Sequence, residues 1–226
     1  MEYDKLKYRH EFKYIVTETQ CAILKARIQP LMRLDQHAGS DGQYSIRSLY
    51  FDDDQDRCYY ENRDGTDPRE KYRIRIYDRS KDYIRLECKR KERGKTQKTS
   101  TPISVDLAHS LMERQDLCVD KLPPPARKMI LMGLHPVIIV EYARIPFEYS
   151  MGNVRVTFDM GISFSASPSG FFEENIPRRP LMPKGLHIME VKYDEFLPDF
   201  IYRALNLGTL RQTTFSKYYL CRESSF

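Results

Sequence analysis

The sequence predicts an α+β fold built on a closed antiparallel β-barrel, with a charged interior and helices packed on its apolar outside. At least five segments alternate charged and apolar residues with a period of two, as half-buried strands do. Each segment gives one face to Arg, Lys and Glu. An open sheet with one wet basic face explains one or two such strands, whereas a closed barrel explains all of them. Because cations inside a barrel repel one another, this lining also predicts a bound anion.

The clearest alternation lies between residues 69 and 98, where two runs flank a polar turn at 78–82. In the first run Arg73 and Arg75 share one face, opposite a face of apolar residues. Two alternating runs around a short turn are typical of a β-hairpin. This stretch has 13 Lys and Arg against 5 Asp and Glu, so its net charge of +8 exceeds the +5 of the whole chain. Neighbouring arginines on one face become favourable when a polyanion lies across them, since guanidinium groups suit phosphate oxygens.

The other elements follow from periodicity and capping signals. Thr17 predicts a helix start, because Gln20 lies three residues on and apolar residues then recur at helical spacing. The acidic run at 52–56 lacks the glycine and the distal glutamate of a calcium-binding loop, which favours a turn into a short helix. Further strands are expected at 8–16, 44–51, 137–149, 154–160 and 187–193, and helices at 17–32, 55–65, 105–114, 126–133, 198–207 and 215–221.

Composition limits the class of protein. The length of 226 residues fits a single domain over residues 1–226. The five cysteines are scattered without a CxxC pair, which favours reduced thiols and a cytoplasmic location. The polar start is unlike a signal peptide, and no apolar run has membrane-spanning length.

Eight short motifs resemble one known family. In chain order they are RHEFKY, SLYFD, YRIRIY, LECKRK, EYAR, VRVTFD, MEVKYD and FSKY, between about residues 8 and 220. This succession resembles the vacuolar transporter chaperone (VTC) domain, the polyphosphate polymerase branch of the triphosphate tunnel metalloenzymes (CYTH-like), in its compact bacterial form. Each motif is weak alone, but eight in order form a specific signal.

The resemblance implies an eight-stranded tunnel that transfers the γ-phosphoryl group of ATP to a growing polyphosphate chain. It also implies a divalent metal, Mn²⁺ or Mg²⁺, held by Glu190 with Glu87 and Glu11 in support. By motif position, the catalytic residues would be Lys13, Arg73, Arg75, Lys89, Glu190 and Lys217. The phosphate-binding residues would be Lys13, Arg73, Arg75, Lys89, Lys98, Tyr142, Arg144, Arg155, Lys192, Ser216 and Lys217.

Two positions depart from the family pattern. Related tunnel phosphatases begin with Glu-x-Glu-x-Lys, but here Arg9 replaces the first acidic residue and leaves Glu11 and Lys13. This reduces the acidic metal site and fits the polymerase branch better. In the eukaryotic domain a lysine precedes the serine of the FSK motif by two residues, whereas this chain has Thr214 there. One phosphate contact is therefore missing from the expected set.

Several alternatives stay open at this stage. The chain could be a triphosphatase of the same fold, or a polyphosphate-binding subunit without catalysis, as some VTC chains are. Nucleic-acid binding is not expected, since the tyrosines of the basic hairpin alternate onto the face opposite the cations. Without a bound anion, Arg73 and Arg75 would be solvated, Glu190 and Lys192 would form an ion pair, and Ser216 would cap a helix. A membrane-protein partner that translocates the product would place the chain at the inner face of a membrane.

Overall fold

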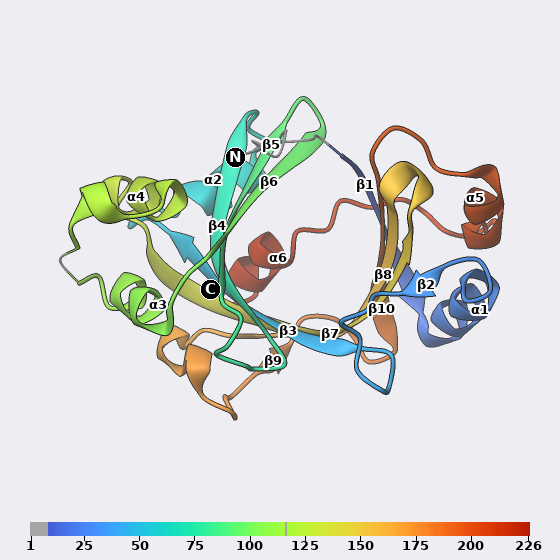
Figure 1. Cartoon of the computed structure of the whole chain (residues 1–226), viewed down its shortest axis with the longest axis horizontal. Helices are drawn as coiled ribbons and strands as arrows, with labels where there is room; N and C mark the ends of the chain where they lie inside the picture. The colour runs from blue at the N-terminus through green and yellow to red at the C-terminus, as the bar shows by residue number, and fades with distance from the viewer. Residues whose placement is uncertain (1–8, 116) are drawn as a thin grey trace.

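The computed structural model describes residues 9–115 and 117–226 and has an α+β architecture (Figure 1). A curled antiparallel sheet forms its centre, with strands in the order β1-β10-β8-β7-β3-β4-β5-β6. Two short strands lie off this path: β2 pairs with β7, and β9 pairs with β8. The strands are β1 His10–Thr17, β2 Arg33–Leu34, β3 Tyr44–Asp52, β4 Arg69–Tyr77, β5 Arg85–Glu92, β6 Lys95–Pro102, β7 His135–Tyr149, β8 Val154–Ser165, β9 Arg179–Pro180 and β10 Leu186–Tyr193.

The helices connect and cover these strands. Thr17 caps α1 through the expected capping box with Gln20, and Ser104 caps α3. The α-helices are α1 Glu18–Ile28, α2 Arg57–Arg63, α3 Val105–Met112, α4 Pro124–Leu131, α5 Asp199–Leu205 and α6 Lys217–Glu223, and three 3₁₀ turns lie at Val119–Lys121, Met151–Asn153 and Pro168–Phe172. The expected elements are thus confirmed to within a few residues, although Tyr8 lies outside the described residues.

The two edges of the eight-strand path are β1 and β6. Among the described residues these strands share no continuous ladder, and the contact between them is the isolated bridge between Arg9 and Thr96. The Arg9 amide donates to the Thr96 carbonyl at 3.2 Å. The sheet is therefore a curled half-barrel whose edges are joined by one isolated backbone bridge among the described residues, in place of the fully closed barrel that alternation predicts.

Two helical layers cover the convex face of the sheet (Figure 1). On one side, α3 and α4 pack through Leu111 and Met129 against Ile74 and Leu86 of the central hairpin. On the other side, α1 and α5 share a core with β8 and β10. These contacts confirm that apolar faces point outward under helices, and their burial supplies most of the stabilising hydrophobic free energy.

The helix α6 corrects the expectation that all helices lie outside. Its residues Tyr218 and Cys221 pack with Tyr50, Ile138 and Val140 in one buried cluster. The strand register places these three residues on the same face as the basic side chains, because directly paired residues point to one side. The concave face is thus apolar toward one end, where α6 covers it, and charged over the rest.

The acidic run after β3 forms a structural turn, as the sequence indicates. The Asp52 carboxylate is fully buried and accepts backbone N–H bonds from Asp53, Cys58 and Tyr59. It also accepts the hydroxyl of Tyr218, which ties α2 to α6. Because both oxygens of Asp52 are occupied by these four hydrogen bonds, the carboxylate has no free lone pair for a metal ion.

None of the helices in the described part of the chain combines the length and the apolar character that crossing a membrane requires.

Candidate functional site

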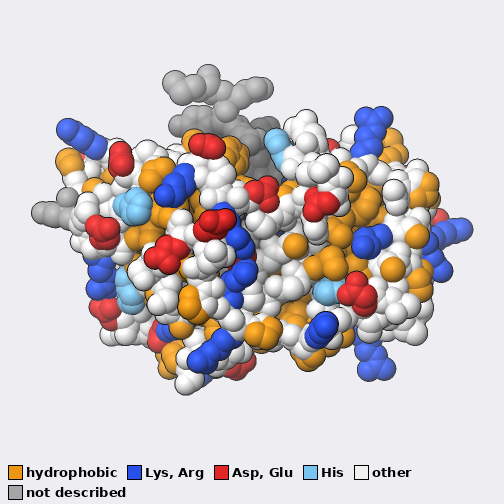
Figure 2. Space-filling view, turned by 90° about the horizontal axis from the view of Figure 1, so that it is seen from below, with side chains coloured by type: hydrophobic (Ala, Val, Ile, Leu, Met, Phe, Trp, Pro, Cys, Tyr) orange, Lys and Arg blue, Asp and Glu red, His pale blue; other side chains and the backbone are white. Residues whose placement is uncertain are grey.

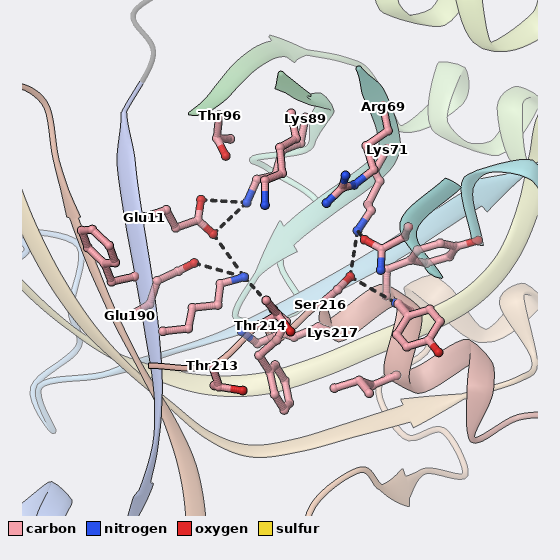
Figure 3. A pocket seen from close by; sticks show the side chains of 18 of the residues that line it. Glu11, Arg69, Lys71, Lys89, Thr96, Glu190, Thr213, Thr214, Ser216 and Lys217 are labelled. Carbon is pink, nitrogen blue, oxygen red and sulfur yellow. Dashed lines mark hydrogen bonds and ion pairs between the residues drawn. The ribbon is translucent and has the colours of Figure 1, made fainter. Parts of the chain in front are cut away.

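A cavity of about 710 Å³ lies on the charged part of the concave face. Figure 3 shows side chains from β1, β4, β5, β10 and the segment before α6 converging on it. The outer face seen in Figure 2 instead mixes acidic, basic and hydrophobic groups. Among the described residues, the cavity is lined by two carboxylates, Glu11 and Glu190, and by eleven cations: Lys13, Arg63, Arg69, Lys71, Arg73, Arg75, Lys89, Lys91, Arg144, Lys192 and Lys217.

The two carboxylates lie together on one wall of the cavity, because β1 and β10 are paired. Lys13 lies opposite Glu190 in the register, and Glu11 lies opposite Lys192. The Lys13 amine is 3.2 Å from Glu11 and 3.7 Å from Glu190. The Glu11 carboxylate binds Lys89 at 2.8 Å, and Glu190 binds Lys192 at 2.9 Å. Each carboxylate thus bridges cations from different strands (Figure 3).

These cations keep both carboxyl groups ionised. Burial and the neighbouring Glu190 raise the pKa of Glu11, but Lys89 and Lys192 outweigh them and leave that pKa below its usual value. Burial raises the pKa of Glu190, whereas Lys192 and Lys13 lower it well below its usual value. Burial also lowers the pKa of Lys89 to about 8. This wall therefore presents two anionic oxygen donors, which are the ligand type that Mg²⁺ and Mn²⁺ prefer.

Glu87 is the centre of a second ion cluster, on β5. Its Oε2 accepts from Arg73 Nε at 2.8 Å and lies 3.8 Å from Arg75 Nη1, while its Oε1 accepts from Lys98 at 3.0 Å. Burial raises the pKa of Glu87, but these three cations hold it well below its usual value. The cluster fixes the two arginines side by side on the cavity floor.

Asp159 of β8 organises a third cluster. Arg144 binds both of its oxygens, at 2.7 and 2.9 Å, and the Lys217 amine reaches Oδ2 at 2.5 Å. The Arg144 guanidinium also lies 3.7 Å from Glu190. Asp159 is fully buried, and although burial raises its pKa, Arg144 and Lys217 lower it to about 2. Asp159 therefore fixes two cations of the cavity, Arg144 and Lys217, although it does not itself line the cavity.

Tyr142 lies between these cations on the cavity wall. Its hydroxyl accepts from Arg75 at 3.3 Å and from Arg144 at 3.4 Å, and its ring faces the Lys217 amine at 4.7 Å. Burial raises the pKa of Tyr142, yet Arg144 and Arg75 bring it below its usual value. Because the hydroxyl proton is free to point into the cavity, Tyr142 can donate a hydrogen bond to an anion there.

Ser216 caps helix α6, as expected, and its hydroxyl also contacts the amine of Lys71. Its hydroxyl accepts from the Tyr219 amide of α6 at 3.3 Å and from the Lys71 amine at 2.8 Å. The amine of Lys71 also binds the side-chain oxygen of Asn62 on α2. The hydroxyl proton of Ser216 remains available for an anion in the cavity.

Three predicted residues do not line the cavity. Arg155 is drawn away by an ion pair with Asp35 at 2.5 Å, and Lys98 is held by Glu87. Glu87 itself does not join Glu11 and Glu190, since no group of three metal-binding side chains occurs among the described residues. Both oxygens of Glu87 contact cations outside the carboxylate pair of Glu11 and Glu190, so its supporting role at a metal stays a prediction. The other predicted site residues all line the cavity.

Other cavity residues were missed by sequence reasoning. Arg63 lies on α2 outside the strands, so alternation gives no signal for it. Lys71, Arg69 and Lys91 continue the basic faces of β4 and β5, and the strand alternation could have identified them. Asp159 could have been found from the common face that it shares with Arg155 and Thr157.

Solved structures with the same fold cover nearly the whole chain. HpAC1 from Hippeastrum, provisionally described as an adenylyl cyclase with a dominant triphosphatase activity, has a TM-score of 0.56 and 11% identity, with 96% of each chain covered. A Vibrio parahaemolyticus protein provisionally described as an adenylate cyclase has a TM-score of 0.54 and 11% identity, covering 96% of this chain and 98% of its own. PH1819 from Pyrococcus horikoshii has a TM-score of 0.53 and 14% identity, covering 96% and 99%. At these identities the similarity establishes the fold alone.

No curated protein sequence matches the chain. A family model described as VTC domain matches residues 8–226, which is nearly the full length. The motif order, the curled antiparallel sheet and the basic cavity agree with that match. This chain belongs to the VTC domain family.

Proposed function

We propose that the chain is a polyphosphate polymerase that transfers the γ-phosphoryl group of ATP to the end of an inorganic polyphosphate chain. The observation that carries this proposal is the cavity, whose lining within the described ranges holds eleven cations around two carboxylates on one wall. Such an excess of positive charge suits a substrate with many phosphate groups. Membership of the VTC domain family supports the same substrate class.

The chain's own residues would act through position and charge. Arg73 and Arg75, aligned by Glu87, would bind the oxygens of the transferred phosphoryl group. Arg144 and Lys217, held by Asp159, would contact the same group from positions beside Arg75. These cations stand in place before substrate arrives, so little reorganisation is needed as charge develops in the transition state.

The carboxylate wall fits a divalent metal. Glu11 and Glu190 are ionised oxygen donors on neighbouring strands and line the cavity, so they would hold Mn²⁺ or Mg²⁺ together with phosphate oxygens. When bound, the ion would neutralise phosphate charge and orient the reacting groups. Lys13, which contacts both carboxylates, would then be released toward the phosphate chain.

A triphosphatase is the second candidate. It is favoured by the fold shared with HpAC1, a protein with a dominant triphosphatase activity. The same cations would bind the triphosphate, and water would replace the polyphosphate end as the acceptor. A third candidate is a subunit that binds polyphosphate without turning over ATP, and the test below separates all three.

The purified protein is incubated with ATP and Mn²⁺, with and without a short polyphosphate primer. Products are separated on a polyacrylamide gel stained for polyphosphate, while ADP and free phosphate are measured in parallel. We expect long chains, with ADP matching the phosphate incorporated. Free phosphate without long chains would instead support the triphosphatase. Polyphosphate binding without either product would leave a binding subunit.

Glu190→Gln tests the role of the carboxylate wall. The substitution removes one anionic ligand at nearly constant shape, so we expect turnover to fall about 100-fold or more. Polyphosphate binding in a metal-free titration should persist, because the cations remain. Glu113→Gln, on the exposed end of α3, is the matched control. Equal turnover in both variants would remove Glu190 from the mechanism.

A further inference from the structure

The acidic run at 52–56 caps α2 in an unusual way. Asp56 occupies the N-cap position, where an aspartate ordinarily accepts an amide of its own helix. Within the described ranges its side chain makes no such bond, and its φ of 53° is uncommon for residues other than glycine. Asp53 accepts the amide of Arg57 at 3.0 Å, and Asp52 accepts the next two amides, at 2.8 and 3.0 Å. Two earlier aspartates therefore cap the helix, and the carboxylate of Asp56 is free for another partner.

That partner lies on α6. The guanidinium of Arg222 donates to the Asp56 carboxylate, in an ion pair that is largely buried. One turn earlier on α6, the hydroxyl of Tyr218 donates to Asp52. Tyr218 and Arg222 are four residues apart, so they lie on the same face of the helix. We call Asp52, Asp56, Tyr218 and Arg222 the α6 anchor.

The start of α6 carries two residues of the cavity. Ser216 is the N-cap of this helix and Lys217 is its first residue, and both line the cavity (Figure 3). The Lys217 amine lies 2.5 Å from Asp159 and 4.7 Å from the centre of the Tyr142 ring. A helix of seven residues has little stability of its own, so its position depends on side-chain contacts. Because Tyr218 directly follows Lys217, the anchor holds α6 next to these cavity residues.

The bond between Tyr218 and Asp52 is well protected. Tyr218 is fully buried, and its ring lies 5.2 Å from that of Tyr50, whose hydroxyl accepts from Arg73 at 2.9 Å. Burial raises the pKa of Tyr218, and the Asp52 carboxylate raises it further. The hydroxyl therefore keeps its proton and remains a donor to Asp52.

We propose that the α6 anchor positions Ser216 and Lys217 in the cavity. Among the described residues, Asp52, Asp56 and Arg222 do not line the cavity, so they would act on a bound anion through α6. They are therefore positioning residues. The proposal rests on the proposed function only in that the anion in the cavity carries phosphate groups. An acidic run that resembles a cation site at first sight would thus serve the binding of an anion.

Two substitutions test the anchor in the full chain. Tyr218→Phe removes one hydroxyl and keeps the ring, while Asp56→Asn removes the charge that holds Arg222. The first measurement is reductive methylation of lysines in the ligand-free protein, read by mass spectrometry. The Lys217 side chain is 10% exposed in the wild type, so it should react slowly there and several-fold faster in both variants. Lys89, on β5, is the internal reference and should react at an unchanged rate.

The second measurement is tripolyphosphate affinity, by calorimetry and without ATP. Lys217→Met should lower the affinity about tenfold or more, because a charge-assisted contact is lost. Tyr218→Phe should lower it by part of that factor, about threefold. In the Lys217→Met background, Tyr218→Phe should add little, since both substitutions act on the same contact. An anchor that only stabilised the fold would instead lower the urea midpoint and leave both labelling and affinity unchanged.

The controls are Tyr202→Phe and Asp199→Asn, which remove an exposed hydroxyl and an exposed ion pair from α5. Both should match the wild type in the two measurements. Unchanged labelling of Lys217 in Tyr218→Phe and Asp56→Asn would overturn the proposal, and so would additive losses of affinity in the double variant. Tyr218→Phe removes a single oxygen atom and decides the question even if Asp56→Asn does not fold.

The labelling is independent of the activity test. Wild-type protein that binds no tripolyphosphate and forms no polymer would refute the proposed function, while the labelling of Lys217 would still show whether the anchor positions α6. Wild-type protein that forms polymer, with Lys217 labelled equally in the wild type and both variants, would refute the anchor and leave the polymerase standing.

Discussion

The cavity contains two groups of cations with different surroundings. In the first group, a buried carboxylate lies behind the cations, as Asp159 lies behind Arg144 and Lys217. In the second group, which consists of Arg69, Lys71 and Lys91, no ion pair forms among the described residues, and neutral oxygens contact Arg69 and Lys71. The first group is therefore stable and prearranged without a ligand, whereas the second retains uncompensated charge for one. The difference separates cations whose positions are fixed by a buried carboxylate from cations that form no ion pair among the described residues.

Asp159→Asn should have the largest effect on stability. The change leaves Arg144 and Lys217 buried without their common counter-ion, and breaking a buried pair from one side costs about 3–5 kcal/mol. Urea unfolding measures the free energy of unfolding. Added tripolyphosphate should restore more stability to this variant than to the wild type, because the anion replaces the lost carboxylate.

The control is Asp199→Asn, which breaks the exposed ion pair between Asp199 and Arg203 on α5. Exposed pairs contribute about 0–1 kcal/mol, so this loss should be small. A loss in Asp159→Asn as small as that in the control would show that the first group does not depend on its buried carboxylate.

Much of the fold could be predicted because most strands have one apolar face. The central hairpin shows this: Ile74 and Leu86 pack outward under helices while Arg73 points inward, as alternation requires. Strand β6, Lys95–Pro102, was missed because KTQKTSTP is polar on both faces and forms an edge of the sheet. The place of α6 was also missed, since a seven-residue helix signal does not reveal which face of a sheet it covers.

The candidate site could be predicted at the level of faces but not of partners. The alternation along the strands correctly predicted that Lys13, Arg75 and Glu190 point into the same cavity. The alternation could not predict that both oxygens of Glu87 contact cations, because these contacts depend on the register of β4, β5 and β6. Arg155 shows the same limit, since its partner Asp35 comes from a distant loop.

Lys71→Met should change how stability depends on pH. Burial, then Lys89, Lys13 and Arg69, lower the pKa of Lys71 well below its ordinary value, while Cys58 on α2 opposes this slightly. The folded protein then binds fewer protons at Lys71 than the unfolded chain does. The contribution of Lys71 to stability should therefore rise with pH between its lowered pKa and about 10.5, and should be constant below and above that window. The variant should lose up to about 1.4 kcal/mol per pH unit of this slope.

Urea unfolding at a series of alkaline pH values gives the slope for wild type and variant. Lys81→Met, on an exposed turn, serves as the control and should keep the wild-type slope. In the wild type, bound polyphosphate should favour the ammonium form and so cause proton uptake, visible as a binding enthalpy that depends on the buffer. Identical slopes in wild type and Lys71→Met would mean that Lys71 keeps an ordinary pKa and that the charge of the second group is already compensated.

The smallest effect, and the one of opposite sign, is expected for Arg69→Gln/Lys91→Gln in the absence of ligand. These two side chains are directly opposed across β4 and β5, so removing them relieves repulsion and should stabilise the fold by about 0.2–1 kcal/mol. Thermal unfolding at low salt shows the change best, since added salt screens it. With long-chain polyphosphate present the order should reverse, because only the wild type can bind phosphate oxygens with these two side chains. If the ligand-free variant proved clearly less stable than the wild type, Arg69 and Lys91 would belong with the first group of cations, whose role is to hold the fold together.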